Sequence, residues 1–150
     1  MEQIDNFFKN NITVSVISKS IDETINIGKY IAKYLSNNIV VLNGDLGCGK
    51  TLLTKGIISY FSDNKVTSPT FSIVNEYILD NINIYHFDVY RLKDSDEFIK
   101  TIGEDYFYNG LCIIEWGNII KDILPKNSIY IDFEYIDEFT RKITLNEVKK

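Results

Sequence analysis

Residues 44–51 read GDLGCGKT, and this stretch decides the fold class. It fits the pattern G-x-x-x-x-G-K-[ST], in which glycines let the backbone turn so that its N–H groups surround phosphate oxygens. The all-apolar run 39–42 precedes it, and apolar residues at helical spacing follow it between Leu53 and Phe61. A buried strand, a glycine-rich turn and an amphipathic helix together form a phosphate-binding unit. The stretch therefore predicts a nucleotide-binding α/β fold.

The side chains of this stretch have expected tasks at a bound nucleotide. Lys50 is expected to bridge the terminal phosphates and to act in catalysis, and the Thr51 hydroxyl is expected to ligate Mg²⁺. The following helix directs its positive end at the same phosphates. The residues expected to hold the nucleotide are Gly44, Asp45, Leu46, Gly47, Cys48, Gly49, Lys50, Thr51 and Leu52.

A P-loop enzyme also needs a carboxylate near its metal, and two candidates follow strand-like runs. Glu115 comes directly after the apolar run 111–114, as in a Walker-B strand with Glu in place of Asp. Asp88 lies near the end of another such run. Ligands bind at the carboxyl ends of strands in α/β sheets, so both acids are candidate catalytic residues. For Asp88, an ion pair with Arg91 or a turn cap is the alternative.

Two further side chains lie close to these acids in sequence. His86 is the sole histidine, which excludes a histidine-rich metal site. We expect it to be a packed or hydrogen-bonded strand side chain. Trp116 follows Glu115 and is expected in the core or at its rim. The sequence pattern assigns neither of them a part in the chemistry.

The rest of the chain alternates between strand-like and helix-like patterns. Ser20 followed by Glu23 resembles a capping box at the start of a helix. The strands expected from apolar alternation or apolar runs are 12–17, 39–42, 71–79, 82–90, 111–116, 128–136 and 141–148. The expected helices are 20–37, 53–61, 94–107 with a break at Gly103, and 118–124. This pattern predicts a single domain over residues 1–150. Its fold class is expected to be α/β and similar to P-loop NTPases, with a mixed β-sheet and helices on both faces.

Composition narrows the possible partners and compartment. The chain has 150 residues, 45% of them hydrophobic, and a net charge of -5, so strong binding of nucleic acid by this chain alone is not expected. Its two cysteines make no disulfide framework and are expected as free thiols in a reducing compartment. No apolar run is long enough to span a membrane, and no signal peptide is recognisable, so we expect a cytoplasmic protein.

The sequence is compatible with several classes of P-loop protein. No N-K-x-D guanine reader is present, which favours ATP over GTP. The chain has only two arginines, Arg91 and Arg141, which are few for a kinase. A minimal ATPase with a conformational output fits best. The alternatives are a phosphotransferase acting on a small molecule or a protein, and a nucleotide-gated binding module.

Four strings, in this order, resemble the bacterial TsaE family, formerly YjeE. They are GDLGCGKT at 44–51, SPTFSIVNEY at 68–77, HFDVYRL at 86–92 and IEW at 114–116. The resemblance implies the small ATPase component of the machinery that makes N6-threonylcarbamoyladenosine at position 37 of tRNA. Such a protein binds the TsaB–TsaD heterodimer, chiefly TsaD, and meets tRNA only through that complex. It hydrolyses ATP with Mg²⁺, slowly without partners, and so sustains repeated turnover.

The resemblance also implies roles for particular residues. Thr51 and Glu115 match the magnesium ligands, and Asp88 matches an acid implicated in hydrolysis through the attacking water. Arg141 matches an arginine close to the nucleotide. A loop that responds to nucleotide, like a GTPase switch, matches Thr67, Ser68, Pro69 and Thr70. The sequence departs from the family pattern at Cys48, where alanine is common, and this thiol is expected to make the loop sensitive to oxidation or alkylation.

Overall fold

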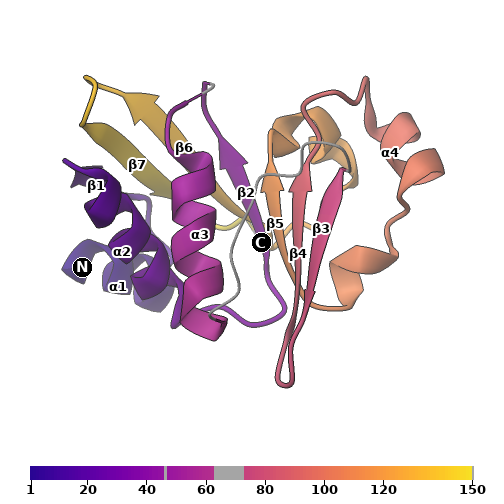
Figure 1. The fold of residues 1–150 in the computed structure, drawn as a ribbon, viewed down its shortest axis with the longest axis horizontal. Helices are drawn as coiled ribbons and strands as arrows, with labels where there is room; N and C mark the ends of the chain where they lie inside the picture. Colours follow the sequence, from indigo (N-terminus) through magenta and orange to yellow (C-terminus); the bar gives the residue numbers. More distant parts are fainter. Residues whose placement is uncertain (46, 63–72, 150) are drawn as a thin grey trace.

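The computed structural model describes residues 1–45, 47–62 and 73–149 (Figure 1). The helices are α1 (Glu2–Asn10), α2 (Ile21–Ala32), α3 (Lys50–Phe61) and α4 (Ser95–Thr101), with two 3₁₀ helices, η1 (Asp105–Tyr108) and η2 (Gly117–Ile123). The strands are β1 (Val14–Ser18), β2 (Ile39–Asn43), β3 (Val74–Ile78), β4 (Asn83–Asp88), β5 (Leu111–Glu115), β6 (Ile129–Tyr135) and β7 (Arg141–Asn146).

The described strands form a seven-stranded sheet in the order β1-β7-β6-β2-β5-β4-β3. The four central strands, β6, β2, β5 and β4, pair in parallel, whereas β1, β7 and β3 join by antiparallel pairing. Central parallel strands have both faces covered, which explains why β5 is buried along its whole length and β2 up to Leu42. The predicted mixed sheet is confirmed.

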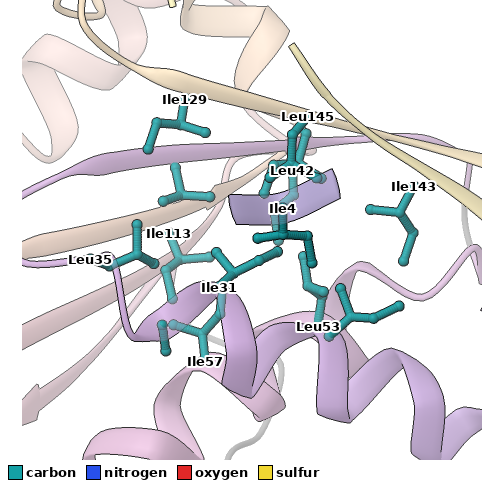
Figure 2. Packing of buried hydrophobic residues seen from close by; sticks show 14 of the residues in the cluster. Ile4, Ile31, Leu35, Leu42, Leu53, Ile57, Ile113, Ile129, Ile143 and Leu145 are labelled. Carbon is teal, nitrogen blue, oxygen red and sulfur yellow. The ribbon is translucent and has the colours of Figure 1, made fainter. Parts of the chain in front are cut away.

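Helices cover both faces of the sheet, as predicted. In β2, Val40 and Leu42 join a core cluster with residues of α1, α2 and α3. Figure 2 shows this cluster, in which Ile4, Ile31 and Leu53 come from the three helices and meet strand residues such as Leu42. Ile39 and Val41 point the other way, into a second cluster with residues of α4, η1 and η2. The period-two alternation of a strand thus divides one apolar run between two layers of core.

The two helices that flank the phosphate loop in sequence pack closely on each other (Figure 1). A Cβ at Gly28 in α2 would lie 2.3 Å from the Leu53 carbonyl oxygen, and one at Gly56 in α3 would lie 2.0 Å from the Ile25 carbonyl oxygen. Both glycines are therefore required by close backbone approach, and this contact fixes α3 and the loop at its start.

The structure differs from the sequence-based expectations at three helices. Helix α1 was not predicted; its Asp5 accepts hydrogen bonds from the hydroxyls of Tyr30 (2.8 Å) and Tyr34. The helix expected over 20–37 begins at the Ser20 cap but ends at Ala32, after which the backbone bonds shorten to i→i−3 turns. The segment expected over 118–124 is a 3₁₀ helix.

The break at Gly103 is confirmed, since that residue has φ +89° and separates α4 from η1.

In the described ranges, no helix has the length and apolar character needed to cross a membrane.

Candidate functional site

The phosphate loop joins the end of β2 to the start of α3. Its described glycines have backbone angles in the region that favours glycine, with φ of +148° at Gly44, +77° at Gly47 and +106° at Gly49. A Cβ at Gly44 would also lie 2.7 Å from the Cys48 Sγ. Leu46 lies outside the described residues. The glycine spacing is therefore dictated by the turn, as the motif predicts.

Lys50 is folded back onto the loop that precedes it. Its Nζ donates hydrogen bonds to the carbonyl oxygens of Gly44 (2.6 Å) and Asp45 (3.0 Å) and lies 4.3 Å from the ring centroid of Trp116. The side chain is 4% exposed. Two carbonyl oxygens of the loop and the face of the Trp116 ring thus hold the ammonium group of Lys50 beside the loop.

Thr51, Glu115 and His86 form a continuous line of polar contacts. The Thr51 hydroxyl donates to Glu115 Oε1 at 3.3 Å, and the other carboxylate oxygen, Oε2, lies 2.5 Å from His86 Nε2. Glu115 is 4% exposed and His86 is fully buried. The two expected metal ligands, from α3 and β5, are therefore adjacent in space.

Asp88 and Glu115 lie opposite each other in the parallel pairing of β4 with β5. Asp88 Oδ1 accepts a hydrogen bond from the Tyr90 N–H at 3.1 Å, which is the turn cap considered as an alternative. Burial raises the pKa of the Asp88 carboxyl above its ordinary value; the Tyr90 N–H opposes this rise, and the charge of Glu115 adds to it. The capping role does not remove Asp88 from the site, because Asp88 also lines a cleft together with Lys50 and Thr51.

Seven of the expected residues line one cleft of about 290 Å³, whereas Gly44, Asp45, Cys48 and Arg141 do not line it. Its lining is Gly47, Gly49, Lys50, Thr51, Leu52, Asp88, Glu115 and Trp116. A larger concavity, of about 540 Å³, lies between η2 and the strands β6 and β7, but none of the described loop residues lines it. The charged and hydroxyl groups suited to phosphate chemistry are gathered in the smaller cleft.

Arg141, distant in sequence, lies beside the loop. Its Nη2 is 3.4 Å from the Gly47 carbonyl oxygen, and its Nη1 donates to carbonyl oxygens of the β6–β7 turn, with the Asp137 oxygen at 2.5 Å. The guanidinium also lies 4.9 Å from the ring centroid of Tyr135. Arg141 therefore lies at the phosphate loop, with its guanidinium bound to backbone carbonyl oxygens.

Residues Thr67, Ser68, Pro69 and Thr70, the expected switch loop, lie outside the described residues. Cys48 is described and is 1% exposed, with its Sγ 3.6 Å from Lys50 Nζ. The thiol therefore packs as a small core residue in this conformation, and reagents reach it only if the loop opens.

His86 is a buried, hydrogen-bonded strand side chain and Trp116 lies at the rim of the core, as predicted, but their contacts with Glu115 and Lys50 were not predicted. A signal for His86 was present, because residues 86 and 88 of one strand point to the same side of a sheet. Its pairing with Glu115 depends on the β4–β5 register, which no local pattern encodes. Trp116 has φ +65° at the junction of β5 and η2, and this strained turn brings its ring to Lys50.

Comparisons with known proteins place the chain in a family. The family model described as "Threonylcarbamoyl adenosine biosynthesis protein TsaE" matches residues 18–143. A Rickettsia bellii protein named "tRNA threonylcarbamoyladenosine biosynthesis protein TsaE" is 41% identical over 128 residues, covering 83% of this chain and 89% of its own. A Bacillus subtilis protein of the same name is 35% identical over 130 residues, covering 85% and 81%.

A solved structure shares the fold. The crystal structure of YdiB from Bacillus subtilis superposes with a TM-score of 0.75 at 30% sequence identity, covering 91% of this chain and 86% of that one. The family match spans most of the chain, and the fold match covers 91% of it. The chain therefore belongs to the TsaE family of threonylcarbamoyl adenosine biosynthesis proteins.

Proposed function

We propose that this chain is a Mg²⁺-dependent ATPase that acts in tRNA threonylcarbamoyladenosine modification by binding the TsaB–TsaD complex and sustaining its turnover. One observation is the main support for this proposal. The phosphate loop brings Lys50 and Thr51 into one cleft with Glu115 and Asp88, which come from two neighbouring parallel strands. Strand, loop, helix and acids are the parts that P-loop ATPases use.

The donor set at Thr51 and Glu115 fits magnesium. Both groups offer oxygen atoms and lie 3.3 Å apart, so together they would supply the protein ligands of one ion. Within the described ranges, no cluster of three His, Cys, Asp or Glu side chains is suited to a metal. That agrees with Mg²⁺ at phosphates, where one or two protein ligands are supplemented by phosphate oxygens and water. When bound, the ion neutralises charge on the phosphates.

Each side chain of the cleft would then have a defined task. Lys50 would leave the Gly44 and Asp45 carbonyl oxygens for phosphate oxygens, which bind an ammonium group more strongly. Loop N–H groups and the start of α3 would hold the same phosphates. Asp88, which faces the cleft, would accept a hydrogen bond from the attacking water and orient it.

The proposal includes slow hydrolysis by the isolated chain. The Arg141 guanidinium is engaged with carbonyl oxygens of its own turn and of Gly47, and Arg91 is exposed. An arginine that reaches the transferred phosphoryl group is worth about 10³–10⁵ in rate. A partner that supplies or reorients such a group would accelerate hydrolysis.

Phosphate release from ATP tests the enzymatic part directly. Lys50→Ala is expected to lower the rate by about 10²–10³, because a cation aimed at developing charge is lost. Lys55→Ala is the matched control, since Lys55 is exposed on the same helix and is absent from the cleft lining. An Asp88→Asn, Glu115→Gln double variant that hydrolyses ATP as fast as wild type would instead support a binding module without catalysis.

The same reaction separates hydrolysis from phosphoryl transfer. With ATP labelled in the γ-phosphate, we expect the label in free phosphate. Label on a small molecule or on a protein would favour the phosphotransferase alternative.

A further inference from the structure

We propose that His86 is a positioning residue, which fixes the carboxylate of Glu115 for its task as metal ligand. The inference rests on the proposed function, because it concerns the Mg²⁺ site of the same cleft. His86 does not line that cleft among the described residues; it acts through Glu115.

The carboxylate of Glu115 is held from two opposite directions. Oε2 lies 2.5 Å from His86 Nε2, and Oε1 lies 3.3 Å from the Thr51 hydroxyl. A carboxylate with one oxygen fixed by an imidazole keeps the other oxygen pointed at a defined place. Here that place is the side chain expected to share the ion.

The backbone around Glu115 is fixed as well. Its carbonyl oxygen accepts from the Val89 N–H at 3.3 Å, and the next residue, Trp116, donates its N–H to the Leu42 carbonyl oxygen at 3.0 Å. Glu115 is therefore held between β4 and β2, and rotation of its own side chain is the remaining freedom. The His86 contact removes that freedom.

Burial explains why a hydrogen-bond donor is needed on this side. Glu115 is 4% exposed, and a nearly buried carboxylate must be hydrogen-bonded or paired. The carboxylate only accepts, so Nε2 of His86 carries the shared proton. Nδ1 is buried without a hydrogen-bond partner among the described residues, so Nε2 is the ring nitrogen through which His86 bonds. His86 thus presents one donor, aimed at Glu115.

Loss of this donor should affect the metal more than the nucleotide. Outer partners of metal ligands typically contribute about 10–100-fold to metal affinity. Nucleotide without metal would be held by the loop and Lys50, and the hydrogen bonds described for Lys50 Nζ go to Gly44, Asp45 and Cys48 rather than to His86. A His86 variant should therefore lose affinity for the metal while keeping its affinity for nucleotide without metal.

The test compares His86→Gln with His86→Asn. The amide nitrogen of Gln can replace Nε2, whereas the Asn amide corresponds to Nδ1 and is too short to reach Glu115. Phe87→Leu is the control. Phe87 is the neighbouring buried residue of β4, but it packs in the core cluster with residues of α4, η1 and η2.

Two affinities are measured. The affinity of Mn²⁺ for the complex of the protein with a non-hydrolysable ATP analogue is followed by electron paramagnetic resonance. The affinity of the analogue itself is measured once with Mn²⁺ present and once with EDTA present.

We expect His86→Asn to weaken Mn²⁺ binding to the protein–analogue complex by about 10–100-fold. His86→Gln and Phe87→Leu should remain close to wild type, and the analogue should bind all four proteins equally in EDTA. Equal Mn²⁺ affinity in wild type and His86→Asn would overturn the inference alone. A wild-type protein that binds no analogue at all would overturn the proposed function and the inference with it.

A second measurement needs no substitution, since His86 is the only histidine and its imidazole gives a unique NMR signal. We expect the Nε2–H proton to exchange slowly with water in the wild-type protein and to shift when Mg²⁺ joins the bound analogue. An Nε2–H proton that exchanges like that of free imidazole would contradict the inference, whether or not the Asn variant folds.

Discussion

At the scale of single residues, the site is defined by carboxylates whose environments differ. Glu115 is nearly buried and bonded to His86 and Thr51, whereas Asp88 is half-buried and bonded to one backbone N–H. Sequence reasoning predicted both acids, because each comes near the end of a strand-like run. It did not predict how they differ, because burial and hydrogen bonding of a side chain depend on neighbours distant in sequence.

The raised pKa of Asp88 predicts a pH-dependent stability difference in the metal-free protein. Because the folded state favours the protonated carboxyl, the ionised form destabilises the fold above the raised pKa. Asp88→Asn keeps an oxygen for the Tyr90 N–H but carries no charge. We expect its Tm to exceed that of wild type at neutral pH, with a difference that shrinks as pH falls through the raised pKa.

Thermal unfolding followed by circular dichroism between neutral and mildly acidic pH measures this difference. Asp80→Asn removes the same charge from the exposed β3–β4 turn and serves as the control. A lower Tm for Asp88→Asn at neutral pH, or a difference that grows on acidification, would speak against a destabilising Asp88 charge.

At the scale of elements, local patterns predicted most helices and strands. The cap at Ser20, the buried runs of β2 and β5 and the hairpin of β3 and β4 were all confirmed, because each depends on neighbouring residues. Helix α1 was missed, because what holds it is a tertiary contact, the bonds from tyrosines of the α2 region to Asp5. The glycine contact between α2 and α3 was invisible for the same reason.

That glycine contact leads to a prediction at the element scale. In an isolated helix, Gly→Ala is favourable by up to about 1 kcal/mol. In Gly56→Ala the new methyl would lie 2.0 Å from the Ile25 carbonyl oxygen, so α2 and α3 must move apart. We expect the overpacking to win and the free energy of unfolding to fall by about 1–3 kcal/mol.

Urea unfolding of Gly56→Ala measures the free-energy change. Asn26→Ala, on the exposed side of α2, is the control and should be neutral or slightly stabilising. A Gly56→Ala protein as stable as wild type would mean that the helices are not in backbone contact.

At the scale of the whole molecule, the fold gathers a site from segments far apart in the chain. The loop 44–51, Asp88 of β4, Glu115 of β5 and Arg141 of β7 meet at one end of the sheet. The ordered motifs predicted which residues belong together, and strand order explains how they meet, since β4 and β5 are parallel neighbours. The contacts of His86 and Lys50 required the register of the sheet and could not be predicted from local sequence.

We propose that ATP hydrolysis in this cleft sustains tRNA modification by the TsaB–TsaD complex. The most direct test is the amount of threonylcarbamoyladenosine formed in tRNA over many turnovers by TsaB–TsaD with this protein, comparing wild type, Lys50→Ala and Lys55→Ala. We expect continued product formation with wild type and Lys55→Ala, and arrest after the first round with Lys50→Ala. Undiminished modification with Lys50→Ala would contradict it.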